Sequence, residues 1–159
     1  TISTCGLVEQ IKRFADEKTQ YNLAISLHAP NDKIRSQIMP INKAYPIDKL
    51  MEALKYYTDK NNRRLSFEYI LLKGVNDTEN CVSQLAELTK HFDVYVNLIP
   101  YNHVDENGYV STDYKSAMAF YDKLMKKNVR CTLRQKMGDD IDAACGQLRS
   151  KYERKNIHE

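Results

Sequence analysis

The sequence predicts a parallel α/β sheet folded as a single domain. Apolar runs typical of buried strands alternate along the chain with longer segments in which apolar residues recur at helical spacing. The segments between successive runs are long enough for the crossovers that parallel strands require. A length of 159 residues fits one domain, and neither an internal repeat nor a low-complexity linker interrupts the chain.

Five segments have the apolar periodicity of helices. In the first, Leu7, Ile11 and Phe14 follow the spacing of one helix face. Asp32 is a candidate N-cap for the second, and Pro46 precedes the third, where proline is favoured. In chain order, the predicted helices cover residues 7–14, 32–39, 46–60, 78–92 and 112–127.

Four apolar runs are typical of strands. The first, YNLAISL, is nearly continuous in apolar residues, which indicates a parallel strand buried on both faces. Glu68 and Asn97 interrupt two of the later runs. These side chains either face a barrel interior or form a structural ion pair or hydrogen bond, and the pattern does not choose between the two. The predicted strands cover residues 21–27, 65–72, 94–99 and 129–134.

The composition is that of a soluble globular protein, with 42% hydrophobic and 28% charged residues. No apolar run approaches the roughly 20 residues needed to cross a bilayer, so we expect no membrane partner. A net charge of +3 is too small to establish nucleic-acid binding. Basic residues nevertheless cluster, and each cluster either neutralises phosphates or forms a solvated helix end or tail. The clusters are Arg63 with Arg64, Lys126 with Lys127, and the tail from Arg149 to Lys155.

The cysteines carry no metal-binding pattern. Cys5, Cys81, Cys131 and Cys145 form no CxxC pair and have no zinc-ligand spacing, so the sequence predicts no metal site within this chain. With no sign of secretion, they are expected to be reduced thiols. Reduced thiols are typical of the cytoplasm, which is the predicted location of the protein.

Polar side chains lie at or just past the carboxyl ends of the expected strands. Ser3, Ser26–His28, Lys73–Gly74 and Tyr101–Asn102 all have this position. That edge of a parallel sheet is where α/β proteins bind ligands. The glycines form neither GxGxxG nor a P-loop, whereas hydroxyl, imidazole and amide groups suit a ribose and a zwitterionic amino-acid group. Taken singly, the first serine could cap a helix, and the histidine and the asparagine could be turn residues.

The segment 138–148, GDDIDAACGQL, concentrates three aspartates, two glycines and one cysteine. Ile141, Cys145 and Leu148 lie at helical spacing, so Cys145 could be a buried packing residue. The glycines oppose that interpretation, because each weakens a helix by roughly 1 kcal/mol. The spacing alone does not decide between a packing role and a chemical role.

Five motifs follow one another along the chain: SLHAPND at 26–32, MPIN at 39–42, GVND at 74–77, NLIPYN at 97–102 and GDDIDAACGQL at 138–148. In order and spacing they resemble the RlmN/Cfr family, the radical-SAM RNA adenine methyltransferases. The resemblance extends to about Leu148. Its five ordered motifs make it far more specific than any single short pattern.

The resemblance implies a role for each matching position. Cys145 would be the catalytic residue, methylated as an S-methylcysteine intermediate and then linked transiently to the RNA. The implied substrate is 23S rRNA, methylated at C2 of an adenine. Methylation at C8, as in the resistance enzymes of the family, and tRNA as a further substrate stay open. A non-catalytic α/β module that binds RNA or a partner is the alternative from another class. The positions implied to contact S-adenosylmethionine are Ser3, Ser26, Leu27, His28 and Asn102.

The chain departs from the family in what it lacks. The family holds a 4Fe–4S cluster with a CxxxCxxC motif and uses a second, resolving cysteine, and neither occurs in this sequence. The resemblance therefore implies the C-terminal portion of a partial (β/α)6 radical-SAM barrel, with residues 1–149 as core and 150–159 as a basic tail. The cluster ligands would lie upstream, and an electron donor would reduce the cluster. By itself the chain is expected to be inactive and to self-associate through an exposed sheet edge.

Overall fold

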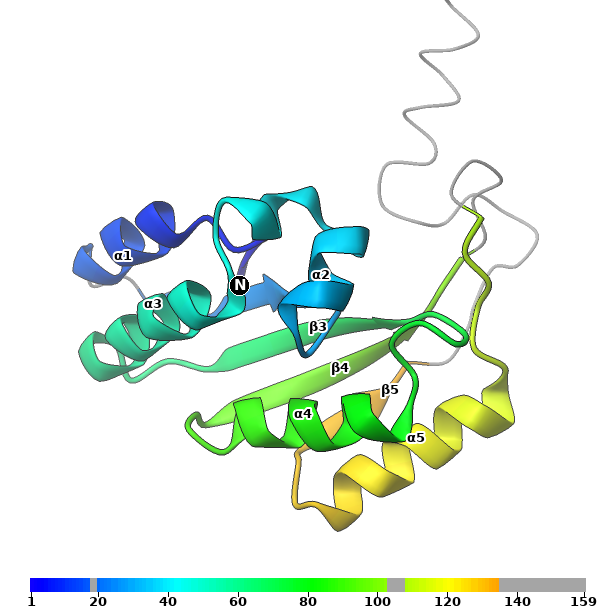
Figure 1. Ribbon diagram of the computed structural model, residues 1–159. Helices are drawn as coiled ribbons and strands as arrows, with labels where there is room; N and C mark the ends of the chain where they lie inside the picture. The colour runs from blue at the N-terminus through cyan, green and yellow to red at the C-terminus, as the bar shows by residue number, and fades with distance from the viewer. Residues whose placement is uncertain (18–19, 103–107, 135–159) are drawn as a thin grey trace, which may run out of the picture.

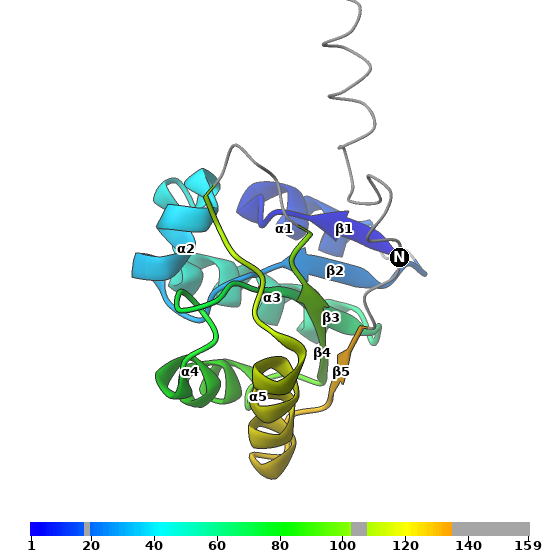
Figure 2. The same ribbon diagram turned by 90° about the vertical axis from the view of Figure 1, so that its right-hand side faces the viewer.

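A computed structural model describes residues 1–17, 20–102 and 108–134 and confirms the parallel α/β architecture. Five strands form one sheet in the order β1-β2-β3-β4-β5, and every neighbouring pair is parallel. Because successive strands are neighbours and crossovers share one hand, the helices gather on one face of the sheet (Figures 1 and 2). The strands are β1 Ile2–Thr4, β2 Leu23–Ser26, β3 Leu65–Leu71, β4 Val94–Pro100 and β5 Cys131–Leu133.

The helices lie where the apolar periodicity predicts them, but one predicted cap is wrong. Asn31, not Asp32, caps α2, because its side-chain oxygen accepts the backbone N–H of Ile34 at 3.0 Å. The Asp32 carboxylate instead accepts the N–H of Ile47 at 2.8 Å and so ties the start of α2 to the start of α3. The helices are α1 Val8–Asp16, α2 Asp32–Ile38, the 3₁₀ turn η1 Pro40–Lys43, α3 Ile47–Lys60, α4 Glu79–Thr89 and α5 Tyr114–Lys126.

Among the described residues, helices cover one face of the sheet, yet β2 is buried on both faces over most of its length, as predicted: Leu23, Ala24 and Ile25 are each at most 4% exposed. In β3, buried residues alternate with partly exposed ones: Phe67 and Tyr69 pack under the helices, and Glu68 faces the open side. Ala24 of β2 lines that open side but is itself buried.

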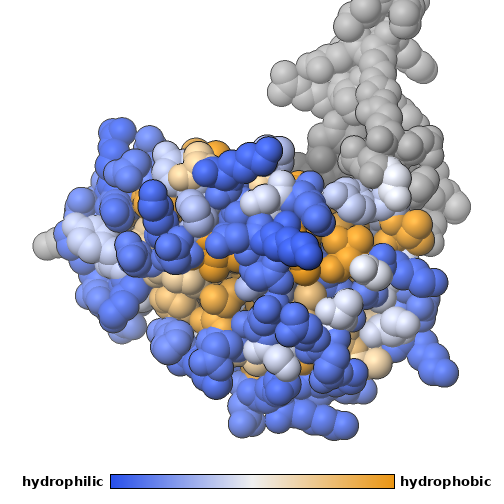
Figure 3. Space-filling view, viewed as in Figure 1, coloured by the Kyte–Doolittle hydropathy of each residue, from blue (hydrophilic) through white to orange (hydrophobic). Residues whose placement is uncertain are grey.

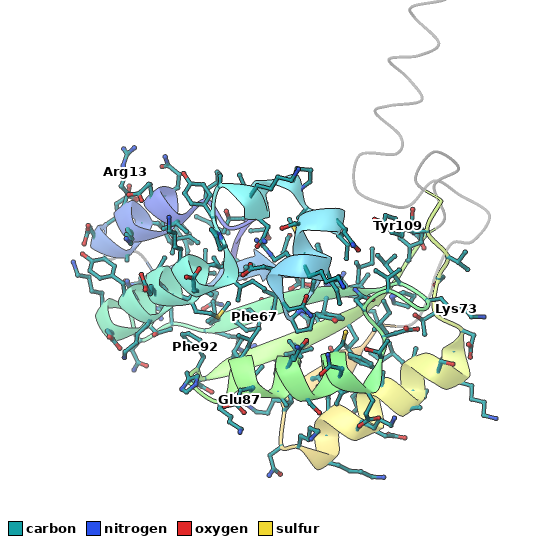
Figure 4. The ribbon with its side chains drawn as sticks, viewed as in Figure 1. Arg13, Phe67, Lys73, Glu87, Phe92 and Tyr109 are labelled. Atoms are coloured by element: carbon teal, nitrogen blue, oxygen red, sulfur yellow. The ribbon has the colours of Figure 1, made fainter. Side chains whose placement is uncertain are left out.

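The hydrophobic core lies between the sheet and the helices. Phe67 of β3 meets Phe92 edge to face, with ring centroids 6.4 Å apart, and Tyr69 stacks on Phe120 of α5 at 5.8 Å. Figure 4 labels Phe67 and Phe92 in this layer. Figure 3 shows the helical side as largely hydrophilic, with apolar side chains visible between the helices. Within the described residues, no helix is long and apolar enough to cross a membrane.

The outer edge of β1 has no partner strand among the described residues, and its Ile2 side chain is 41% exposed. Such an edge is a template for pairing with another chain. We therefore expect the 159-residue chain to self-associate with increasing concentration in analytical ultracentrifugation. Ile2→Lys should favour the monomer, because a charge on an edge strand opposes pairing. A chain that stays monomeric at high concentration would contradict this expectation.

Candidate functional site

The open face of the sheet forms a cavity of about 710 Å³, within the size range of small-molecule sites. Its lining side chains stand in rows across the strands. Strand register places Ser26 of β2 beside Glu68 of β3, Glu68 beside Asn97 of β4, and Asn97 beside Thr132 of β5. Ser3 of β1 lines the same cavity. Every strand of the sheet thus contributes a polar side chain to this face.

Hydrogen bonds connect the central row and hold one carboxylate in place. Asn97 Nδ2 donates to Glu68 Oε1 at 2.8 Å, and Thr132 Oγ1 donates to Asn97 Oδ1 at 3.1 Å. Ser66 Oγ reaches the same carboxylate oxygen at 3.3 Å. The structural hydrogen bond expected as one alternative for Glu68 and Asn97 is therefore confirmed, and both side chains line the open face of the sheet.

The charged side chains that line this cavity are an acidic residue in the central row and arginines from both ends of the strands. Among the described residues that line it, Glu68 is the acidic one, and it belongs to the central row. Arg64 precedes β3 and Arg134 follows β5, so the cationic groups come from opposite ends of the strands. A ligand with both a cationic and an anionic group would find complementary partners here.

His28 takes a backbone conformation that few residues adopt. Its φ is +57°, in the left-handed region. Its Nδ1 accepts the backbone N–H of Ile70 at 3.2 Å, which places the imidazole proton on Nε2. Burial, and secondarily the charge of Arg35, lowers the pKa of His28 to about 4. At neutral pH the ring is therefore an uncharged donor that lines the cavity.

Asn76 of the GVND motif holds the His28 turn in place. Its side-chain N–H₂ donates to the carbonyls of His28 and Ile70, both at 2.7 Å, and its Oδ1 accepts the N–H of Leu72 at 2.8 Å. The residue is completely buried. All hydrogen-bonding groups of this amide are thus engaged with the protein, so the asparagine of the motif has a structural explanation.

The side chain of Arg35 holds the ends of β1 and β2 in place through hydrogen bonds. The side chain is completely buried. Its Nε donates to Leu27 O at 3.1 Å, and its Nη2 donates to Cys5 O at 2.8 Å and Ser26 O at 3.3 Å. Nη1 donates to Oδ1 of Asn42 at 2.9 Å, which explains the asparagine of the MPIN motif. Sequence reasoning missed Arg35, because a charged residue on a short helix gives no sign of burial.

The structure brings part of the predicted site together. Ser3, Ser26 and His28 line one cavity. The Leu27 side chain is fully buried, and its backbone lies at the strand end, where its N–H donates to Glu68 O at 3.1 Å. Asn102 is half-buried and is not among the residues lining the cavity. Cys145 lies outside the described residues.

The turn at Lys73 and Gly74 does not line the cavity, contrary to expectation. The N–H of Lys73 donates to Val110 O at 2.9 Å, and that of Gly74 donates to Asp77 Oδ1 at 2.8 Å. Figure 4 shows Lys73 beyond the carboxyl ends of the strands. These residues therefore shape the loop after β3.

No metal site is found in the part of the chain that the structure describes: no group of three or more histidine, cysteine, aspartate or glutamate side chains could hold an ion. Cys5, Cys81 and Cys131 are free thiols. Burial raises the pKa of Cys131 to about 11, which makes that thiol a poor nucleophile at neutral pH.

Similarity to curated proteins extends over nearly the whole chain. A Spiroplasma citri protein described as a probable dual-specificity RNA methyltransferase RlmN is 56% identical over 153 residues, covering 96% of this chain and 44% of the relative. A Shouchella clausii protein with the same description is 54% identical over 160 residues, covering 99% and 45%. The chain thus spans less than half the length of these relatives. No family model matches it.

Two solved structures share the fold. A radical SAM methyltransferase from Sphaerobacter thermophilus has a TM-score of 0.86 and 41% identity, over 91% of this chain and 42% of its own. A domain of pyruvate-formate lyase-activating enzyme from Bacteroides vulgatus has a TM-score of 0.59, over 84% of this chain and 98% of that domain. At 13% identity, the second likeness shows the fold alone.

The buried guanidinium of Arg35 should be essential for stability. Arg35→Met keeps the length of the side chain but removes the guanidinium donors of the carbonyls of Leu27, Cys5 and Ser26. We expect the free energy of unfolding to fall by about 3 kcal/mol, as for other broken buried charge networks. Arg13→Met, on the exposed end of α1 (Figure 4), should change it by no more than about 0.5 kcal/mol. Denaturant titration measures both, and equal effects would contradict the assignment.

His28 should make stability depend on pH in a defined window. Its pKa falls from 6.5 to about 4 on folding, so the folded state binds fewer protons than the unfolded state between these values. The contribution of neutral His28 to the free energy of unfolding is complete above about pH 6.5 and is lost as the pH falls towards 4. The loss amounts to about 3 kcal/mol, since each pKa unit corresponds to about 1.4 kcal/mol.

The control for this pH dependence is His28→Asn. Asparagine tolerates the left-handed conformation and does not titrate. Denaturant titrations of the two proteins from pH 7 to pH 4 should therefore diverge, with the variant showing the flatter profile. Parallel profiles would show that His28 is not the titrating group.

Proposed function

We propose that this chain is part of an enzyme that methylates C2 of an adenine in 23S rRNA. The reason is its similarity to the RlmN methyltransferases over nearly its whole length. The relationship confirms the resemblance that the five motifs indicate. The observation that carries the proposal is the cavity on the open face, in which Ser3, Ser26 and His28 meet. The fold that it shares with a radical SAM methyltransferase supports the same reaction class.

The residues of the cavity fit S-adenosylmethionine. The ligand carries ribose hydroxyls, two cationic groups and a carboxylate. The cavity offers serine hydroxyls, the Nε2–H of neutral His28, the Glu68 carboxylate and the guanidinium of Arg134. When bound, S-adenosylmethionine and a 4Fe–4S cluster supply the methyl group and the radical chemistry. Since the sequence contains no CxxxCxxC motif, the proposal places the cluster ligands elsewhere in the complete protein.

Each binding residue has a distinct part in the proposal. Ser3 and Ser26 offer hydroxyl groups from adjacent strands to the ligand. The Nε2–H of His28 donates without adding a positive charge beside a cationic ligand. Leu27 has a supporting part, since its side chain is buried and its backbone bonds to Glu68, Ala29 and Arg35 behind the cavity. Asn102, which follows β4, would contribute its amide.

Cys145 is the proposed catalytic residue, on the basis of the GDDIDAACGQL motif. C2 of adenine is electron-poor and is not a nucleophile towards a methyl group. A cysteine thiolate is a good nucleophile for displacement. In the proposal, the Cys145 thiolate would take up a methyl group by displacement, with S-adenosylhomocysteine as the leaving group. That methyl carbon would lose one hydrogen atom, to the radical that the cluster and a second S-adenosylmethionine supply, before it bonds to the base in a transient protein–RNA crosslink. The target adenine must be exposed or flipped out of its stack to be reached.

The partners follow from the same reaction. An electron donor is required to reduce the cluster. The relatives are described as dual-specificity RNA methyltransferases, which favours a second RNA substrate, and we propose tRNA for that role. The 159-residue chain without cluster ligands should not methylate RNA by itself.

Mass spectrometry of RNA treated with the full-length protein tests the proposal. With a reduced cluster and S-adenosylmethionine, nucleosides from digested 23S rRNA should contain 2-methyladenosine. Cys145→Ala should abolish the product, whereas Cys5→Ser, at a half-buried position outside the proposed site, should retain it.

Two results would contradict parts of this proposal. If 8-methyladenosine formed without 2-methyladenosine, the C2 assignment would be wrong. If Cys145→Ala kept full methylation, the cysteine mechanism would be wrong, and a role as an RNA- or partner-binding module would be favoured for this chain.

A further inference from the structure

Three arginines from two separate segments meet at the amino-terminal edge of the sheet. Arg63 and Arg64 immediately precede β3, and Arg130 immediately precedes β5. Together with Asn62 and Tyr95 they line a second cavity, of about 350 Å³. The sequence shows Arg63 and Arg64 as one basic cluster among several, whereas the parallel register adds Arg130 to it. We call Arg63, Arg64 and Arg130 the arginine edge.

The arginine edge carries more positive charge than its surroundings neutralise. Asp93 is the acidic residue among those that line this cavity, and its carboxylate pairs with Arg130. The side chains of Arg130 and Asp93 are 59% and 87% exposed. Ion pairs at such exposure contribute little stability. Arg130 can therefore exchange Asp93 for an anionic ligand at small cost.

The arginine edge is continuous with the open face of the sheet. Arg64 and Tyr95 line both cavities. Tyr95 is half-buried, and its hydroxyl donates to Cys131 O at 3.4 Å, so the ring is positioned between them. An aromatic ring beside arginines is a combination that single-stranded RNA uses, with phosphates on the guanidinium groups and a base on the ring.

We propose that the arginine edge binds the phosphate backbone of the RNA substrate next to the open face of the sheet. The inference rests on the proposed function and adds to it a surface for the RNA. Guanidinium groups bind phosphate oxygens through paired hydrogen bonds, which position the nucleic acid without reading its sequence. Tyr95, between the two cavities, provides a stacking surface for a nucleotide that leads from this edge towards the open face.

RNA binding by the full-length protein tests the proposal. Fluorescence anisotropy with a labelled fragment of the rRNA substrate gives the affinity at several salt concentrations. Replacing all members of the arginine edge, as R63Q/R64Q/R130Q, should weaken binding about tenfold or more at 0.1 M salt. It should also reduce the slope of log affinity against log salt by about 2, since each phosphate contact contributes roughly 0.7 to 0.9.

A matched control removes the same charge elsewhere. Arg13, Lys49 and Lys115 are exposed residues of α1, α3 and α5, on the helical side of the molecule. R13Q/K49Q/K115Q lowers the net charge equally and should leave the salt slope near its wild-type value. An equal loss in both triple variants would indicate a general charge effect and would overturn the proposal.

Asp93→Asn supplies a test that a folding defect cannot imitate. Removing the carboxylate frees Arg130 for phosphate, so RNA affinity should rise about two- to threefold. Weaker or unchanged binding by Asp93→Asn would count against the arginine edge.

The outcomes separate this inference from the proposed function. Wild-type affinity and salt slope in R63Q/R64Q/R130Q, with methylation by the wild-type protein intact, would overturn the arginine edge alone. A wild-type protein that binds RNA through these arginines but does not methylate it would instead overturn the proposed function. Direct titration of S-adenosylmethionine into R63Q/R130Q, which keeps Arg64 of the shared lining, should give wild-type affinity, because Arg63 and Arg130 line the second cavity and not the first.

Discussion

The buried guanidinium of Arg35 is the interaction on which the arrangement of the site depends. A charge without a paired carboxylate is costly to bury, and here the cost is offset by hydrogen bonds to the carbonyls of Leu27, Cys5 and Ser26. These carbonyls belong to the ends of β1 and β2, the strands that carry Ser3 and Ser26. Gly6 permits this approach, since a Cβ there would lie 3.1 Å from Arg35 Nη2. One side chain thus sets the spacing between two parts of the cavity wall.

A second buried side chain, that of Asn76, holds the imidazole of His28 in position. Asn76 binds the carbonyl of His28 and holds it in a left-handed turn, and Ile70 N–H fixes the tautomer. The residues of the motifs therefore have two kinds of role. Ser26 and His28 face the cavity, whereas the asparagines of MPIN and GVND anchor the loops behind it. A motif match identifies cavity-lining and loop-anchoring residues together. Their hydrogen-bond partners show which residue has which role.

The one-sided sheet explains how one small chain can present two polar surfaces. Because the helices of the described residues lie on one face, the other face carries a row of hydrogen-bonded polar side chains centred on Glu68 and Asn97. The carboxyl ends of the strands carry the motif residues, and the amino ends carry the arginine edge. Both ends open onto the same face, so a small ligand and a longer polyanion could be bound side by side.

The sequence by itself determined the five α-helices, four of the five strands of the described sheet and its parallel character, because apolar periodicity reports directly on which local face is buried. It also located Ser3, Ser26 and His28, since residues at strand ends share one edge in any parallel sheet. It missed β1, whose three residues are exposed or half-buried and give no such pattern. Only the tertiary structure decided which face stays open, that Asn31 caps α2, that Arg35 is buried and that Arg130 joins Arg63 and Arg64. These outcomes depend on register and on partners far apart in the chain, which a local pattern does not encode.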